Sequence, residues 1–196
     1  MSFRKEVKLI LNPSNYYDFK EMLFEKGATI LYPKRLISSL YFDNFQKQCY
    51  VDSIEGTLPR KKIRIRSYPS EKNKIHLFEK KISSPEGRYK TSKKISPQFV
   101  NRISKNGYFD KLYGLVFPII NVTYSREYLK IKNFRVTIDE NIKYCLYKRK
   151  NIKKDRRSIV ELKFSNNQKE DPIINFFTNK LTRFSKYSNG IDTLNM

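Results

Sequence analysis

The sequence predicts an α+β protein in which about eight antiparallel strands form a closed barrel, a tunnel, with helices flanking it. The chain has 196 residues, the length of one domain. Most of it consists of short segments in which apolar and polar residues alternate. The polar positions are unusually basic, since 41 Lys and Arg against 19 Asp and Glu give a formal net charge of +22. We therefore expect a single domain over residues 1–196 with a polyanionic partner.

The expected strands are segments rich in Ile, Val, Tyr, Phe and Thr with a period of two. They lie at residues 3–11, 37–42, 61–68, 75–82, 88–95, 119–128, 134–141 and 158–164.

Three helices have recognisable starts. Ser14 is placed to cap a helix over residues 16–26. Ser96 precedes Pro97 and opens a helix that ends near Asn106, and Asp171 precedes Pro172 and opens one that ends near Arg183. A capping oxygen followed by proline at the first helical position is typical of a helix start.

The polar faces of six expected strands carry charges spaced two residues apart. Because residues i and i+2 of a strand share a face, Lys62, Arg64 and Arg66 lie together, opposite Ile63 and Ile65. The same two-residue spacing places these further sets on one face each: Arg4, Glu6 and Lys8; Glu79 and Lys81; Tyr124 and Arg126; Arg135, Thr137 and Asp139; and Glu161 and Lys163. A solvent-exposed face explains any single group. Its repetition favours faces that line a central cavity.

Like charges inside a cavity repel unless a polyanion or a metal compensates them. The pattern therefore predicts a binder of phosphate chains. Four carboxylates among the cations are candidate ligands for Mg²⁺ or Mn²⁺, which prefer oxygen: Glu6, Glu79, Asp139 and Glu161.

Other classes of chemistry find little support. His76 is the single histidine, and Cys49 and Cys145 lack the spacing of a zinc site and are expected to be reduced thiols. No apolar run of about 18 residues predicts a transmembrane segment. The charged N-terminus lacks the apolar region of a signal peptide, so we expect a cytoplasmic protein.

A series of motifs resembles the polyphosphate polymerase domain of the vacuolar transporter chaperone (VTC) type, which belongs to the triphosphate tunnel metalloenzyme, or CYTH-like, superfamily. The motifs occur in the family's order and span nearly the whole chain: Arg4-Lys5-Glu6-Val7-Lys8, Ile37-Ser38-Ser39-Leu40-Tyr41-Phe42-Asp43, Lys62-Ile63-Arg64-Ile65-Arg66-Ser67-Tyr68, Phe78-Glu79-Lys80-Lys81, Tyr124-Ser125-Arg126, Arg135-Val136-Thr137-Ile138-Asp139, Val160-Glu161-Leu162-Lys163 and Phe184-Ser185-Lys186-Tyr187.

The resemblance implies transfer of the γ-phosphate of ATP to a growing inorganic polyphosphate chain, with Mn²⁺ or Mg²⁺ as cofactor. It implies these catalytic residues: Arg64, Arg66, Lys81, Arg126 and Lys186. The phosphate-binding set adds Lys8, Lys93, Tyr124 and Lys163, with Lys93 chosen from the stretch Lys90-Thr91-Ser92-Lys93-Lys94, and Glu161 is the implied metal ligand. The partners are ATP and inorganic polyphosphate or triphosphate.

Two alternatives remain open. Many hydrolytic relatives begin with Glu-x-Glu-x-Lys, whereas this chain has Arg4 at the first position. One carboxylate fewer weakens water activation, which favours a polymerase over a triphosphatase. The basic run at residues 148–157, together with 14 Tyr and 14 Phe, also fits a nucleic-acid-binding module. We expect no nucleic acid partner, because the aromatic residues are scattered through apolar faces.

Overall fold

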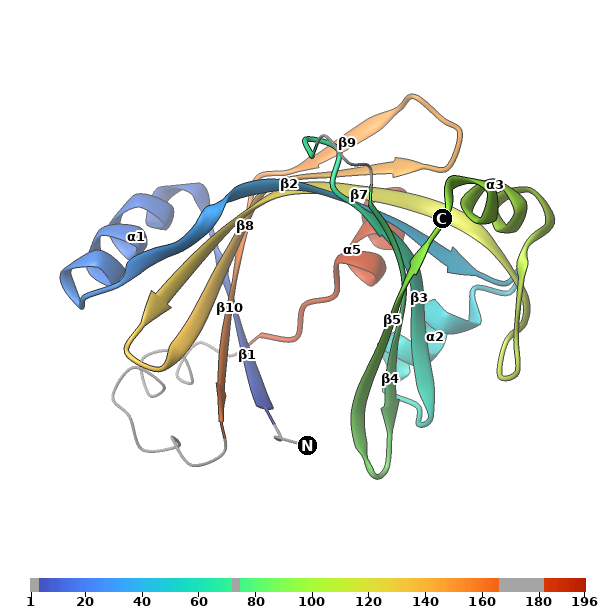
Figure 1. Ribbon diagram of the computed structural model, residues 1–196, viewed down its shortest axis with the longest axis horizontal. Helices are drawn as coiled ribbons and strands as arrows, with labels where there is room; N and C mark the ends of the chain where they lie inside the picture. The colour runs from blue at the N-terminus through green and yellow to red at the C-terminus, as the bar shows by residue number, and fades with distance from the viewer. Residues whose placement is uncertain (1–3, 72–74, 166–181) are drawn as a thin grey trace. The chain divides into compact units, whose positions relative to one another are not determined.

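The fold is taken from a computed structural model that describes residues 4–71, 75–165 and 182–196 (Figure 1). The chain divides into two compact units. Unit 1 comprises Met1–Arg35, Tyr124–Ile142 and Lys154–Phe184, and unit 2 comprises Leu36–Thr123, Lys143–Lys153 and Ser185–Met196. Because β2, β7, β8 and β9 cross the boundaries between these segments, the two units share strands.

Eight strands follow one hydrogen-bonded path in the order β1-β10-β8-β7-β2-β3-β4-β5. Their bounds are β1 Arg4–Leu11, β2 Thr29–Asp43, β3 Arg60–Ser67, β4 His76–Ser84, β5 Gly87–Ile95, β7 Gly114–Ile131, β8 Phe134–Leu146 and β10 Ser158–Ser165. Each of the eight expected segments overlaps one of these strands, but β2, β7 and β8 extend well beyond the expected bounds. Two short strands were not expected, β6 (Tyr108–Asp110), which pairs with β7, and β9 (Ile152–Asp155), which pairs with β8.

The α+β class and the antiparallel pairing are confirmed. The hydrogen-bonded path starts at β1 and ends at β5, and over the described residues it does not close on itself. A closed barrel is therefore not established by the strand pairing.

Two of the three expected helices are present. They are α1 (Tyr16–Glu25) and α3 (Pro97–Asn106), and Ser96 Oγ accepts a hydrogen bond from Phe99 N at 3.2 Å, as its position before proline predicts. Ser14 does not cap α1: it lies in a 3-10 turn over Pro13–Asn15, and its hydroxyl donates to Asn15.

Two further helices, α2 (Gln48–Glu55) and α5 (Lys186–Thr193), were not expected. The helix expected from Asp171 and Pro172 lies almost entirely outside the described residues. Among the described helices, none is long and apolar enough to span a membrane.

In unit 1 the apolar sides of the strands are buried against α1. Phe19 and Leu23 of α1 belong to one buried cluster with Val7 and Leu9 of β1 and Leu162 of β10. Burying these side chains provides the main driving force for folding this unit. Since strand residues alternate between faces, Glu6, Lys8, Glu161 and Lys163 lie on the side away from this cluster.

In unit 2 the buried carboxylate of Asp43, at the end of β2, holds α2 and α5 in place. It accepts hydrogen bonds from the backbone N–H groups of Cys49 (2.9 Å) and Tyr50 (3.0 Å), which lie in the first turn of α2. It also accepts one from the Tyr187 hydroxyl of α5, at 2.5 Å. One carboxylate thus satisfies donors from two helices.

Gly190 lets α5 pack closely in unit 2. A Cβ atom at this position would lie 2.6 Å from Ile120 Cδ1 and 2.9 Å from Tyr144 Cδ1, and both neighbours are fully buried. A glycine is therefore required for the observed packing of α5 against these two side chains.

We predict that Gly190→Ala lowers the free energy of unfolding by about 1–3 kcal/mol, because the added methyl group overpacks a filled core. Urea denaturation measures this change. Ile120→Val removes the Cδ1 atom nearest to the new methyl group, so the double variant should lose less stability than the sum of the two single variants. Strictly additive losses would contradict this packing account.

Candidate functional site

Several basic residues of β3, β4 and β5 in unit 2 share one face of the sheet, whereas Lys61, Lys80 and Lys93 lie on the other. We call Lys62, Arg64, Arg66, Glu79, Lys81 and Lys90 the basic face. The strand register places Lys62 opposite Lys81, and Lys81 opposite Lys90, so three lysines form one row across three strands. Like charges directly opposite each other in a sheet are destabilising. This row therefore places three positive charges close together, where a negatively charged group would be attracted.

Glu79 is the carboxylate at the centre of the basic face. It is 0% exposed and lies opposite Arg64 in the register. Its Oε2 accepts from Arg64 Nε at 2.7 Å and lies 3.6 Å from Arg66 Nε. Its other oxygen is paired with Lys90. One buried carboxylate thus compensates three cations.

The cations around Glu79 set its ionisation. Burial alone raises the pKa of its carboxyl group. The positive charges of Arg64 and Arg66 outweigh burial, and together with Lys90 they lower the pKa from 4.5 to about 2. Glu79 therefore carries its negative charge at neutral pH.

Two tyrosines fix the position of Arg64. Its Nη1 donates to the Tyr41 hydroxyl at 2.9 Å, and its guanidinium lies 5.7 Å from the centre of the Tyr41 ring. Tyr41 in turn stacks on Tyr187 of α5, with 5.2 Å between ring centroids. Lys62 is also tied to the start of α5, where its ammonium donates to Ser185 Oγ at 2.8 Å. Lys186, the first residue of α5, follows directly in sequence.

Unit 1 contains a second buried arginine. Arg126 makes a two-pronged ion pair with Asp139, with contacts of 2.5 and 2.7 Å, and its guanidinium lies 5.4 Å from the Tyr124 ring centre. The two charged residues are 8% and 1% exposed. Burial lowers the pKa of Arg126, but the Asp139 carboxylate outweighs burial and raises that pKa above its usual range. Both groups therefore remain charged.

The neighbouring strands β1 and β10 add a mixed network to unit 1. Lys163 Nζ lies 2.7 Å from Glu161 and 3.8 Å from Glu6, and Lys8 Nζ lies 3.1 Å from Glu6. Lys8 also donates to the backbone oxygen of Phe184 at 3.1 Å. Glu161 is 7% exposed, so its charge is held in a largely dry position.

The donor chemistry of this network suits a divalent cation. Glu6 and Glu161 both reach the Lys163 ammonium, which shows that carboxylates from two strands converge where a positive charge lies. Oxygen is the ligand that Mg²⁺ and Mn²⁺ prefer. Over the described residues, no three His, Cys, Asp or Glu side chains form a metal cluster. Glu6 and Glu161 are therefore the carboxylates of this network that could contribute oxygen ligands to such a cation.

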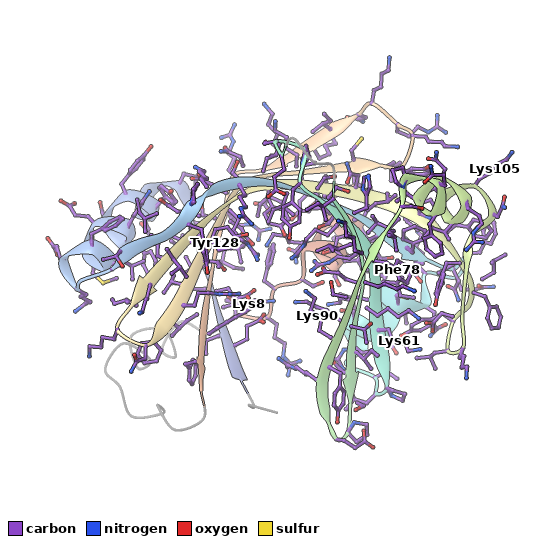
Figure 2. All side chains as sticks on the ribbon, viewed as in Figure 1. Lys8, Lys61, Phe78, Lys90, Lys105 and Tyr128 are labelled. Carbon is purple, nitrogen blue, oxygen red and sulfur yellow. The ribbon has the colours of Figure 1, made fainter. Side chains whose placement is uncertain are left out.

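The strand register shows which of the expected site residues share a face. In unit 2 Arg64, Arg66 and Lys81 share the basic face, and in unit 1 Tyr124 and Arg126 lie together. Lys93 departs from the expectation: it lies opposite Phe78, on the other side of the β4–β5 hairpin. Lys90, which pairs with Glu79, occupies the basic face instead, and Figure 2 shows Lys90 and Phe78 on opposite sides of this hairpin.

Two uncharged residues also lie on these faces: Thr137 was expected there beside Arg135 and Asp139, whereas Ser39 was missed by an interpretation built on charges. Ser39 lies opposite Arg66 in the register and is 0% exposed; Thr137 lies opposite Glu161 and is 1% exposed. Neither hydroxyl has a hydrogen-bond partner among the described residues. Buried hydroxyls usually have one. Their period-two spacing from Tyr41 and Asp139 was the sequence signal for their place on these faces.

A sequence profile of the VTC domain family matches residues 3–115 and 109–195. No curated protein matches the chain by sequence.

Solved structures share the fold at low sequence identity. An adenylate-cyclase-like protein from Bacillus halodurans is 14% identical, covers 94% of each chain and has a TM-score of 0.60. A protein from Hippeastrum, named for an adenylyl cyclase and described as having a dominant triphosphatase activity, is 13% identical over 97% of this chain and 96% of its own, with a TM-score of 0.61. The PH1819 protein from Pyrococcus horikoshii is 12% identical over 97% and 99%, with a TM-score of 0.56.

We predict that the loss of melting temperature caused by Glu79→Gln depends on pH. Ionised Glu79 stabilises the fold fully above its unfolded pKa, about 4.5, and that stabilisation is lost as the pH falls towards about 2. The variant lacks it at every pH. The difference in melting temperature between wild type and variant should therefore be largest near neutral pH and shrink from about pH 4.5 downward.

Glu86→Gln, which removes the same charge from an exposed turn, is the control and should shift the melting temperature little. A difference for Glu79→Gln that stays constant down to about pH 2 would show that Glu79 does not act through its charge.

Proposed function

Because the chain belongs to the VTC domain family of the triphosphate tunnel metalloenzyme superfamily, we propose that it is an ATP-dependent polyphosphate polymerase, a phosphotransferase. The closed tunnel and the cytoplasmic location expected from the sequence are parts of this proposal. Its substrates are ATP and inorganic polyphosphate.

The observation that carries the proposal is the cross-strand row of Lys62, Lys81 and Lys90 beside Arg64. Within this face Glu79 is paired with Arg64 and Lys90. A phosphate chain carries negative charges at regular intervals, so it can neutralise several cations at once. Arginine forks bind two phosphate oxygens together, whereas lysines act as mobile point charges.

The proposed reaction needs positioning and charge neutralisation more than covalent chemistry. A terminal oxygen of the polyphosphate chain attacks the γ-phosphorus of ATP. A new P–O bond forms while the bond between the γ-phosphorus and the β,γ-bridging oxygen breaks, and ADP leaves with that oxygen. The proposed catalytic cations that neutralise the transferred group and the leaving group are Arg64, Arg66, Lys81, Arg126 and Lys186.

Other proposed contacts hold the polymer. Lys8, Lys163 and Tyr124 are proposed to bind phosphate in unit 1, and Lys90 replaces Lys93 in this role in unit 2. Ser39 and Thr137 offer buried hydroxyl donors that can meet phosphate oxygens. Glu161, with Glu6 beside it, is proposed to hold Mn²⁺ or Mg²⁺. A divalent cation bound there would neutralise charge on the phosphate oxygens.

A triphosphatase is the second candidate. The Hippeastrum protein, which has a similar fold, is described as having a dominant triphosphatase activity. The two candidates share the bound phosphate chain and differ in the acceptor, which is a phosphate oxygen in the polymerase and water in the triphosphatase.

The acceptor decides between the two candidates experimentally. Purified protein with ATP and Mn²⁺ should produce ADP and a ladder of polyphosphate on a stained gel, with little free phosphate. Release of free phosphate from ATP or tripolyphosphate without a ladder would select the triphosphatase. Neither product with Mn²⁺ or Mg²⁺ would contradict both candidates.

We predict that substitutions of Arg64 and Glu161 separate binding from turnover. Arg64→Ala should weaken tripolyphosphate binding by roughly ten- to a hundredfold, since a charge-assisted contact contributes about 1.5–3 kcal/mol. Glu161→Gln should leave binding nearly unchanged and abolish metal-dependent turnover, because a neutral amide is a poor ligand for a hard cation.

Titration calorimetry and the activity assay measure the two effects. Lys105→Ala, an exposed change at the end of α3, controls for net charge (Figure 2). Full activity of Glu161→Gln would contradict the proposal that Glu161 binds the metal. Unchanged tripolyphosphate binding by Arg64→Ala would contradict the proposal that the basic face binds phosphate.

A further inference from the structure

A pocket of about 280 Å³ opens on the side of unit 2 opposite the basic face. It is lined by Ile65 and Ser67 of β3, which alternate with Arg64 and Arg66 and therefore face the other way. All of its lining residues belong to unit 2. The pocket is thus separate from the face to which phosphate-chain binding is assigned above.

One part of the pocket is apolar. Leu40 of β2, Ile65 of β3, Val100 of α3 and Leu146 of β8 line it. These four side chains come from four elements of the same unit. They offer a surface for an apolar or aromatic group, as is usual for sites that bind small molecules.

The other part of the pocket is polar and rich in donors. Ser67 Oγ lies within hydrogen-bond distance of His76 Nδ1, at 2.7 Å. Asn121 accepts from Ser38 Oγ through Oδ1 at 2.9 Å, so its amide nitrogen is the end that donates. All four residues, Ser38, Ser67, His76 and Asn121, line the pocket.

Two cations complete the pocket on the turn that follows β8. Lys148 and Arg149 both line it and are exposed. The turn is fixed by a hydrogen bond from Arg149 N to Leu146 O at 3.0 Å, and Lys148 Nζ lies 5.4 Å from the centre of the Tyr147 ring. Among the residues that the structure describes, no aspartate or glutamate lines the pocket. Its polar chemistry is therefore that of an anion site.

We propose that this pocket binds a small phosphomonoester, with the phosphate at Lys148 and Arg149 and an apolar or aromatic body against Leu40, Ile65 and Val100. Neither part accounts for the pocket alone: a bare anion leaves the apolar wall uncovered, and an uncharged apolar molecule leaves the donors unmatched. The proposal does not depend on the function proposed above, because no residue of the basic face contributes to the pocket.

His76 provides the readout, because it is the single histidine of the chain and gives one set of imidazole signals. The full-length protein is titrated with phenyl phosphate, inorganic phosphate and phenol, and the ¹H–¹³C signal of the His76 ring is followed by NMR. Phenyl phosphate should shift this signal saturably and at a lower concentration than inorganic phosphate. Phenol should shift it weakly.

Matched variants locate the response. Arg149→Ala should weaken phenyl phosphate binding by about tenfold or more, since it removes a charge-assisted contact. Lys150→Ala, an exposed change next along the chain that does not line the pocket, should leave binding unchanged. Arg64→Ala should also leave it unchanged, because Arg64 lies on the opposite side of the sheet.

Three results would overturn the proposal. If phenol shifted the His76 signal as strongly as phenyl phosphate, the pocket would bind apolar groups without recognising phosphate. Equal weakening by Arg149→Ala and Lys150→Ala would indicate general attraction to a basic protein. Loss of the His76 response in Arg64→Ala would assign the ligand to the basic face.

Discussion

Compensation of buried positive charge is the constraint on which both units depend. Arg64 is paired with Glu79 in unit 2, and Arg126 with Asp139 in unit 1. In each pair an aromatic ring on the same face lies beside the arginine. A buried charge without a partner is strongly destabilising, so these carboxylates stabilise the two arginines in their buried positions. In unit 2 Glu79 also lies beside Arg66 and Lys90, so one buried carboxylate serves three cations.

The strands of this fold were predictable because alternation has a simple physical cause. In most of the eight main strands apolar and polar residues alternate, which the sequence shows directly; β5, which has no buried residue, is the exception. The helices were less predictable. Helix α2 begins after Lys47, which has a left-handed conformation and makes no side-chain cap, and α5 contains Gly190. Their stability comes from tertiary partners such as Asp43, which a local pattern does not reveal.

The site was predictable to the extent that charge and strand period determine it. The positions of Arg64 and Arg66 followed from the spacing in β3. The position of Lys93 did not, because β5 is a nearly continuous polar strand whose own sequence does not tell its two sides apart. Only its pairing with β4 shows that Lys90 joins Glu79 while Lys93 faces away. The hydroxyl of Ser39 was overlooked because an uncharged side chain gives no signal in a search for charge.

The strict alternation in β3 also limits how this protein can change during evolution. Its two sides carry incompatible chemistry, with Ile63 and Ile65 fully or almost fully buried on one and Arg64 and Arg66 on the other. Inserting or deleting one residue within Arg60–Ser67 would exchange the two sides downstream of the change. Arginines would then enter the apolar core, and isoleucines would replace them beside Glu79. Descendants of this sequence can therefore vary residue types in this strand far more readily than its length, and length changes should accumulate in the connecting turns instead.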